Sequence, residues 1–112
     1  MKDYTKELFL YAANPGVACG HETLILSTSN AMNLISIPMG TRYAILQVEE
    51  VTTSGSSDVI RYLLDGSDPD VSTGLIRGDR ECFDIAGTEN IKKFKSIRLT
   101  ANNHKINVQY FK

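Results

Sequence analysis

The chain has 112 residues, with 12 Lys and Arg against 13 Asp and Glu and a formal net charge of −1 at pH 7. This length indicates one domain, residues 1–112, with a single hydrophobic core, and the balanced charge argues against attraction to nucleic acid or to an anionic membrane. No apolar run approaches the roughly 20 residues that cross a bilayer.

Charged residues interrupt the N-terminal segment at Asp3, Lys6 and Glu7, where a signal peptide has an unbroken apolar stretch. We therefore expect the chain to be synthesised and folded in a cytoplasm, with no membrane among its partners. Cys19 and Cys82 are too few for a disulfide framework, and in a reducing compartment both are expected to be free thiols.

Short strands separated by turns are expected in the first half of the chain. The longest, at residues 42–52, places Ala44, Leu46 and Val48 on one face and a mixed set of side chains on the other. That alternation predicts one buried face and one face turned to solvent or to a partner. The other candidate strands are β-prone and apolar, and the first ends at the turn Asn14-Pro15-Gly16; they lie at residues 8–11, 20–27 and 33–37.

The clearest strand, at residues 59–64, leads directly into a turn-rich loop at residues 65–70. Gly66 tolerates a positive φ and Pro69 lacks a backbone donor, so the strand is expected to end there. Residues 53–58 are polar and contain glycine, which is typical of a flexible loop. We expect this loop to join the strands at 42–52 and 59–64 into an antiparallel hairpin.

The second half of the chain predicts four more strands. Residues 74–78 and 81–85 flank a turn at Gly78-Asp79, and residues 88–94 are expected to form a loop or one short turn of helix. Residues 96–111 are predicted to be a hairpin in which Asn102-Asn103 supplies a type I′ turn. About eight short strands with at most one helical turn indicate an all-β fold, a small antiparallel β-sandwich, with a barrel-like domain as the alternative.

Three carboxylates, those of Asp65, Asp68 and Asp70, lie close together in the loop after the clearest strand. Ca²⁺ prefers several oxygen ligands of this kind, but the order of residues differs from the EF-hand pattern. Ile76 stands where that pattern has its bidentate glutamate. We therefore expect a plain turn here, with no metal ion and no cofactor.

Cys19, His21, Cys82 and His104 are residue types that bind zinc or form a nucleophilic pair. Their spacing matches no zinc-finger or zinc-ribbon pattern. In an extended segment, Cys19 and His21 would point along one face without reaching each other, which disfavours a Cys–His catalytic pair. Structural thiols and surface histidines are the expectation, and no catalytic residue is predicted.

A local basic patch surrounds Phe94 within residues 91–98; its members are Lys92, Lys93, Lys95 and Arg98. Basic side chains beside an aromatic ring are typical of single-stranded nucleic-acid platforms. They are equally typical of an exposed segment whose aromatic ring packs into the core. Since the whole chain is slightly acidic, we expect the second arrangement and no nucleic-acid partner.

Between Arg61 and Phe111, turn and core residues follow one another with an unusual combination of spacings. The pattern R-Y-x-x-D-G-x-x-P is followed by a glycine turn, then by I-x-x-F-x-x-I-R and a final V-x-Y, at Arg61, Tyr62, Asp65, Gly66, Pro69, Gly74, Ile91, Phe94, Ile97, Arg98, Val108 and Tyr110. This arrangement resembles a small β-sandwich module of virion structural proteins from tailed bacteriophages, crAss-like phages among them. Asp70 departs from that module, which has small or hydroxyl residues there.

The resemblance implies a structural, non-enzymatic role in the virion. An auxiliary capsid (decoration) protein would be made in the bacterial host cytoplasm and would dock on other virion subunits, such as the major capsid protein. A head-fibre or tail-associated subunit is the alternative, and a homo-oligomer is compatible with either. Loop residues would make the partner contacts; those expected are Asp65, Asp68, Asp70, Thr53, Ser54 and Ser56.

Two other classes of function are alternatives to this role. A carbohydrate-binding module presents aromatic rings to sugars, but the chain has no Trp. Its tyrosines fall mostly at core positions, as is expected for Tyr11, Tyr43, Tyr62 and Tyr110. An enzyme would need two of the four Cys and His residues named above to meet in a pocket.

Overall fold

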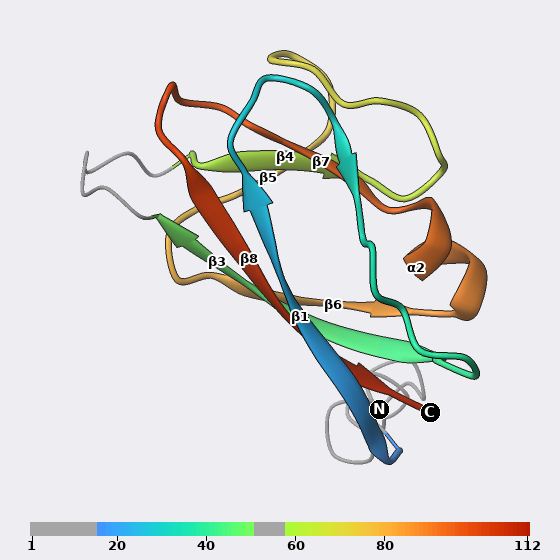
Figure 1. Ribbon diagram of the computed structural model, residues 1–112. Helices are drawn as coiled ribbons and strands as arrows, with labels where there is room; N and C mark the ends of the chain where they lie inside the picture. Colours follow the sequence, from blue (N-terminus) through green and yellow to red (C-terminus); the bar gives the residue numbers. More distant parts are fainter. Residues whose placement is uncertain (1–15, 51–57) are drawn as a thin grey trace, which may run out of the picture.

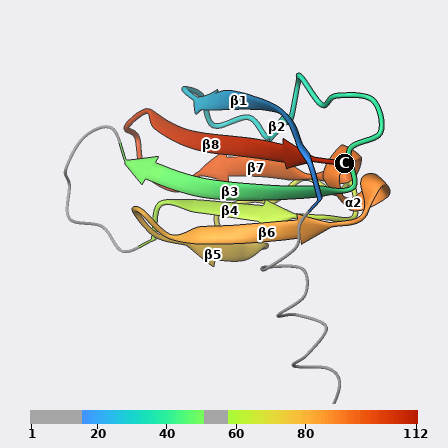
Figure 2. The ribbon, with the colours of Figure 1, turned by 90° about the horizontal axis from the view of Figure 1, so that it is seen from below.

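The computed structural model describes residues 16–50 and 58–112. In these residues, eight strands form two antiparallel four-stranded sheets that pack face to face (Figures 1 and 2). Sheet A has the strand order β1-β8-β3-β6, and sheet B has the order β2-β7-β4-β5. The expected all-β sandwich is therefore confirmed. The strands are β1 (Ala18–Leu26), β2 (Met32–Asn33), β3 (Tyr43–Glu50), β4 (Ile60–Leu63), β5 (Leu75–Arg77), β6 (Cys82–Ala86), β7 (Lys95–Arg98) and β8 (His104–Phe111).

The core lies between the two sheets and is built from alternate residues of their strands. In β3, Ala44, Leu46 and Val48 are completely buried, while Gln47 and Glu49 are exposed. This is the alternation that the sequence predicts for a strand with one buried face. The outer face of sheet A is therefore lined by the other set of residues.

The expected helical turn is present as α2 (Thr88–Lys93), at one end of the sandwich in Figure 1. Phe94 follows it directly and is completely buried. Its ring centroid lies 5.7 Å from that of Tyr62 in sheet B and 6.3 Å from that of Phe83 in sheet A. The aromatic ring of the basic patch is thus a core residue, as expected. No helix in the described part of the chain is long and apolar enough to cross a membrane.

Strand pairing contradicts the two hairpins expected at residues 42–64 and 96–111. β3 lies between β8 and β6 in sheet A, whereas β4 belongs to sheet B. β7 and β8 also lie in different sheets, as do β5 and β6. Among the described non-glycine residues, Arg80 alone has a positive φ, so Asn102-Asn103 does not form the expected type I′ turn. Without that turn the chain is not reversed within one sheet, and it crosses to the opposite sheet instead.

The strand expected at residues 33–37 is also shorter than predicted, because β2 ends at Asn33. The backbone N–H groups of Ile35 and Ser36 each donate to the carboxylate of Glu22, with N···Oε1 distances of 3.1 Å. These donors are therefore not available to a strand ladder. The strand expected at residues 8–11, most of the turn at residues 14–16 and the loop at residues 53–57 lie outside the described residues.

Candidate docking surface

The loop between β4 and β5 is shaped by two of its aspartates. Asp65 Oδ1 accepts a hydrogen bond from Ser67 N at 3.0 Å. Asp70 Oδ1 accepts hydrogen bonds from Ser72 N at 2.8 Å and from Ser72 Oγ at 3.1 Å. Donation from these backbone N–H groups lowers the pKa of both carboxyl groups, so both are negatively charged at neutral pH. Both side chains are exposed, and the turn expected from the sequence carries two fixed charges on the surface.

The same loop is tied to the outer face of sheet B. Because Ile60 and Tyr62 of β4 are buried in the core, Arg61 between them points to the outer face. Arg61 Nη1 donates to Gly74 O at 2.7 Å. Lys95, on the neighbouring strand β7, forms an ion pair with Asp68 at 2.9 Å. The loop is thereby held at two points along its length. Lys95, a member of the predicted basic patch, is engaged in an ion pair within the chain.

Replacing Gly74 with alanine is expected to lower the free energy of unfolding by about 2 kcal/mol. Its φ is 129°, and a Cβ would lie 3.1 Å from Arg61 Cβ and 3.2 Å from Pro69 Cβ. Gly66→Ala is the matched control in the same loop. Gly66 has a φ of 88°, and a Cβ there would meet only Lys93 Cγ, at 3.9 Å, so a loss of about 1 kcal/mol is expected. Urea unfolding of both variants measures the difference, and equal losses would contradict the close packing at Gly74.

Apolar side chains are exposed where this loop joins the edge strand β5. Val71, Leu75 and Ile76 are 76%, 54% and 37% exposed, and β5 is the last strand of sheet B. Asp70, next to Val71, forms a backbone bridge with Thr73. Leu75 and Ile76 lie opposite Tyr62 and Arg61 of β4, so they flank the edge on its two sides, where β5 offers a contact surface to another chain. We call Val71, Leu75, Ile76 and Asp70 the β5 edge surface.

The predicted contact residues are only partly placed by the structure. Asp65, Asp68 and Asp70 are exposed in one ordered loop, although their oxygens also serve the turns and the ion pair described above. Thr53, Ser54 and Ser56 lie outside the described residues. The apolar members of the β5 edge surface were missed, because the strand order that places β5 at a sheet edge could not be derived from the sequence. The run Val71–Ile76, with three apolar residues around a glycine, was the available signal.

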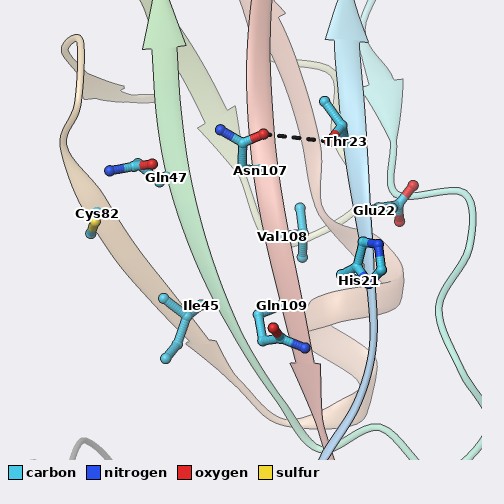
Figure 3. A pocket seen from close by; sticks show the side chains of 9 residues that line it. All are labelled: His21, Glu22, Thr23, Ile45, Gln47, Cys82, Asn107, Val108 and Gln109. Atoms are coloured by element: carbon cyan, nitrogen blue, oxygen red, sulfur yellow. Dashed lines mark hydrogen bonds between the residues drawn. The ribbon is translucent and has the colours of Figure 1, made fainter.

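A shallow hollow of about 500 Å³ lies on the outer face of sheet A (Figure 3). Most of its lining residues carry neutral hydrogen-bonding side chains, and some of these bond one another or the backbone. Thr23 Oγ1 donates to Asn107 Oδ1 at 3.4 Å, and Gln109 Nε2 donates to Gly20 O at 2.8 Å. The hollow is open, and its lining residues are His21, Glu22, Thr23, Ile45, Gln47, Cys82, Asn107, Val108 and Gln109.

The structure separates the cysteines and histidines whose residue types could bind zinc or form a nucleophilic pair. His21 and Cys82 both line the hollow, but they lie on β1 and β6, the two edge strands of sheet A. Three strand spacings place these strands roughly 14 Å apart. No group of three or more His, Cys, Asp or Glu side chains that could hold a metal ion occurs in residues 16–50 and 58–112.

Cys19 and His21 do not share a face, contrary to the expectation for an extended segment. A register shift between Ala18 and Gly20 marks a bulge in β1. It turns Cys19 toward the core, with Sγ 3.6 Å from Thr41 Oγ1, whereas His21 lies on the outer face. His104 is completely buried and is not the surface histidine that the sequence predicted.

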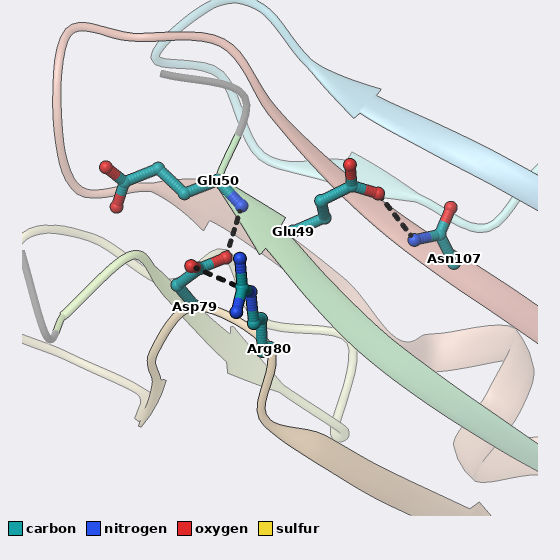
Figure 4. A network of polar contacts seen from close by, with 5 residues as sticks. All are labelled: Glu49, Glu50, Asp79, Arg80 and Asn107. Carbon is teal, nitrogen blue, oxygen red and sulfur yellow. Dashed lines mark hydrogen bonds and ion pairs between the residues drawn. The ribbon is translucent and has the colours of Figure 1, made fainter. Parts of the chain in front are cut away.

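A polar network fixes the corner where β3 ends and β6 begins (Figure 4). Asp79 Oδ1 accepts a hydrogen bond from Glu50 N at 2.8 Å, and Arg80 Nε lies 3.7 Å from Asp79 Oδ2. The Arg80 N–H donates to Val48 O at 2.7 Å. Arg80 has a φ of 66°, an unusual conformation for a residue other than glycine. These contacts connect the loop from sheet B to the end of a central strand of sheet A.

Scans of protein-family models, of curated proteins and of solved structures found no match to this chain. The surfaces described above and the sequence pattern between Arg61 and Phe111 are therefore the features that bear on function.

Proposed function

We propose that this chain is a non-enzymatic virion structural protein of a tailed bacteriophage, an auxiliary capsid (decoration) protein that docks on other virion subunits and stabilises them. The β5 edge surface is the observation that carries the proposal. It combines exposed apolar side chains with the open edge of a sheet. The sequence pattern that resembles phage virion modules supplies the biological setting.

The rigidity of the β4–β5 loop supports docking. The Arg61 and Asp68 contacts and the two aspartate-capped turns hold Val71 in place before any partner is present. A preorganised surface loses little conformational entropy on binding. Many copies on one capsid can then each use a small interface, because their contributions to capsid stability add.

The expected location of the protein is a direct test of this proposal. Density-gradient-purified virions of a tailed phage that encodes the chain should contain it at a fixed copy number relative to the major capsid protein, as measured by quantitative mass spectrometry. Its absence from such virions would overturn the proposal. Its presence in separated tails or fibres, but not in heads, would favour the fibre or tail alternative.

The double variant Val71→Asp/Ile76→Asp should bind heads that lack the chain at least about tenfold more weakly than the wild type in a co-sedimentation assay, because two carboxylates replace apolar contacts. Met39→Asp is the matched control, since Met39 is 94% exposed in the loop before β3. It should bind as the wild type does. Equal binding by the double variant would contradict docking through the β5 edge surface.

A carbohydrate-binding function has one observation in its favour, the hollow of Figure 3. Amide, hydroxyl and imidazole groups line it, and such groups bond sugar hydroxyls well. The described tyrosines, however, are buried at Tyr43, Tyr62 and Tyr110, so they offer no stacking platform for a sugar. Saturable binding of a neutral oligosaccharide in calorimetry, abolished by Gln47→Ala, would favour this function over docking.

A further inference from the structure

His104, the first residue of β8, is completely buried at one end of the sandwich. Its Nε2 lies 2.6 Å from Thr100 Oγ1. Its Nδ1 is buried and has no hydrogen-bond partner among the described residues. Thr100 belongs to the connection between β7 and β8, residues 99–103, which we call the β7–β8 turn. The same hydroxyl oxygen accepts a hydrogen bond from Asn102 N at 3.3 Å, so the imidazole is joined to the turn through Thr100.

The surroundings of the ring favour a neutral imidazole. A buried N–H without an acceptor costs more than a buried lone pair without a donor. We therefore assign the proton to Nε2, which donates to Thr100 Oγ1, and leave Nδ1 unprotonated. A second proton on Nδ1 would create both a buried charge and an N–H group with no acceptor in place.

Charged groups face His104 from three neighbouring elements, whereas β1 places the apolar Leu26 opposite it. Glu50 is its cross-strand partner on β3, Asp79 lies in the loop before β6, and Arg98 ends β7. Burial has the largest effect and lowers the pKa of His104; Arg98 acts in the same direction, and Glu50 and Asp79 oppose it. Asp79 Oδ1 already accepts from Glu50 N, and Arg98 Nη1 donates to Ala101 O at 3.2 Å, within the turn.

We propose that His104 is a proton-sensitive latch, which holds the β7–β8 turn against the end of the sandwich while it is neutral and releases the turn when it is protonated. Protonation is expected to release the turn because Ala101 and Asn103 are already exposed. A small displacement of the turn would therefore admit water to Nδ1. The proposal is independent of docking and holds for either candidate function.

The direction of the pH effect follows from linkage. Because the folded-state pKa of His104 is lower than the unfolded value of 6.5, the unfolded or locally open state binds more protons. The stability that depends on the neutral ring is complete above pH 6.5 and is lost as the pH falls through the folded-state pKa. If the folded-state pKa of His104 lies one pH unit below the unfolded value, the population of the open state at acid pH increases tenfold.

Hydrogen exchange of the Asn102 amide, corrected for intrinsic rates, tests the latch at about pH 7.5 and about pH 5. In the wild type, we expect the protection of this amide to fall several-fold at the lower pH, relative to that of Leu46 in the core. His104→Gln retains a hydrogen-bonding side chain that does not titrate, and it should show no such fall. The chain has two histidines, so His21→Gln on the outer face of sheet A is the matched control and should behave as the wild type does.

Two outcomes would overturn the latch. One is an equal loss of protection in His104→Gln and in the wild type. The other is a gain of protection at acid pH, which would mean that Glu50 binds the protonated ring. If His104→Gln does not fold, two measurements on the wild type test the proposal. An NMR titration must then give a pKa below 6.5 for the imidazole of His104, and the corrected exchange rate of the Asn102 amide must rise as the pH falls through the same range. A pKa at or above 6.5 would overturn the proposal.

Discussion

Replacing Phe94 with alanine is expected to lower the free energy of unfolding by about 3–5 kcal/mol. The side chain is completely buried, and its ring packs against Tyr62 of one sheet and Phe83 of the other. Its removal leaves a cavity between the sheets at the point where the chain passes from α2 to β7. Urea unfolding followed by far-UV circular dichroism measures the loss.

Phe111→Ala provides the control for the loss of an aromatic ring outside this cluster. Phe111 is half-buried at the end of β8, where its ring lies 5.8 Å from that of Tyr43. A loss of about 1 kcal/mol is expected there, because less apolar surface is returned to water. Losses of similar size for the two variants would show that Phe94 is not central to the core.

The second large effect is expected at Glu22, which joins three parts of the sandwich. Its carboxylate on β1 accepts hydrogen bonds from Ile35 N, from Ser36 N and from the hydroxyl of Tyr110 on β8. Tyr110 is completely buried. Glu22→Ala leaves these donors without their acceptor, so we expect the free energy of unfolding to fall by about 2–4 kcal/mol. Thermal or urea unfolding at neutral pH measures the change.

Two further variants separate this effect from a general loss of charge. Glu22→Gln keeps one acceptor oxygen, and about half of the loss is expected. Glu49→Ala removes an exposed carboxylate whose contact is with Asn107 Nδ2 at 3.1 Å, and it should change stability by less than about 0.5 kcal/mol. If Glu49→Ala were as destabilising as Glu22→Ala, the bonds to residues 35 and 36 would not explain the loss.

The sequence predicted the class of the fold because its strands carry a clear period of two. Ala44, Leu46 and Val48 identified the buried face of β3, and the structure confirms it. The Asp65-Gly66 turn was also predictable, since local side-chain chemistry determines it. Both features depend on residues close together in the chain.

Features that depend on distant residues were predicted wrongly or not at all. Which strands pair is decided by burial across two sheets, so a hairpin of β3 and β4 could not be distinguished from a crossover. Glu22 draws residues 35 and 36 out of a strand from 13 and 14 positions away. The bulge between Ala18 and Gly20 places Cys19 and His21 on opposite faces. The β5 edge surface was missed for the same reason, because its recognition requires the place of β5 at the edge of sheet B.

The central position of β8 has a consequence for synthesis on the ribosome. In sheet A, β8 lies between β1 and β3, and these two strands pair with β8 and not with each other. About eighty residues must therefore be translated after β1 before β8, with which it pairs, has been synthesised. During that time, β1 and β3 lack the strand that lies between them in the sheet. Such non-local closure slows folding and leaves strand edges open to aggregation. The nascent chain completes its sandwich only after residues 104–111 have left the exit tunnel.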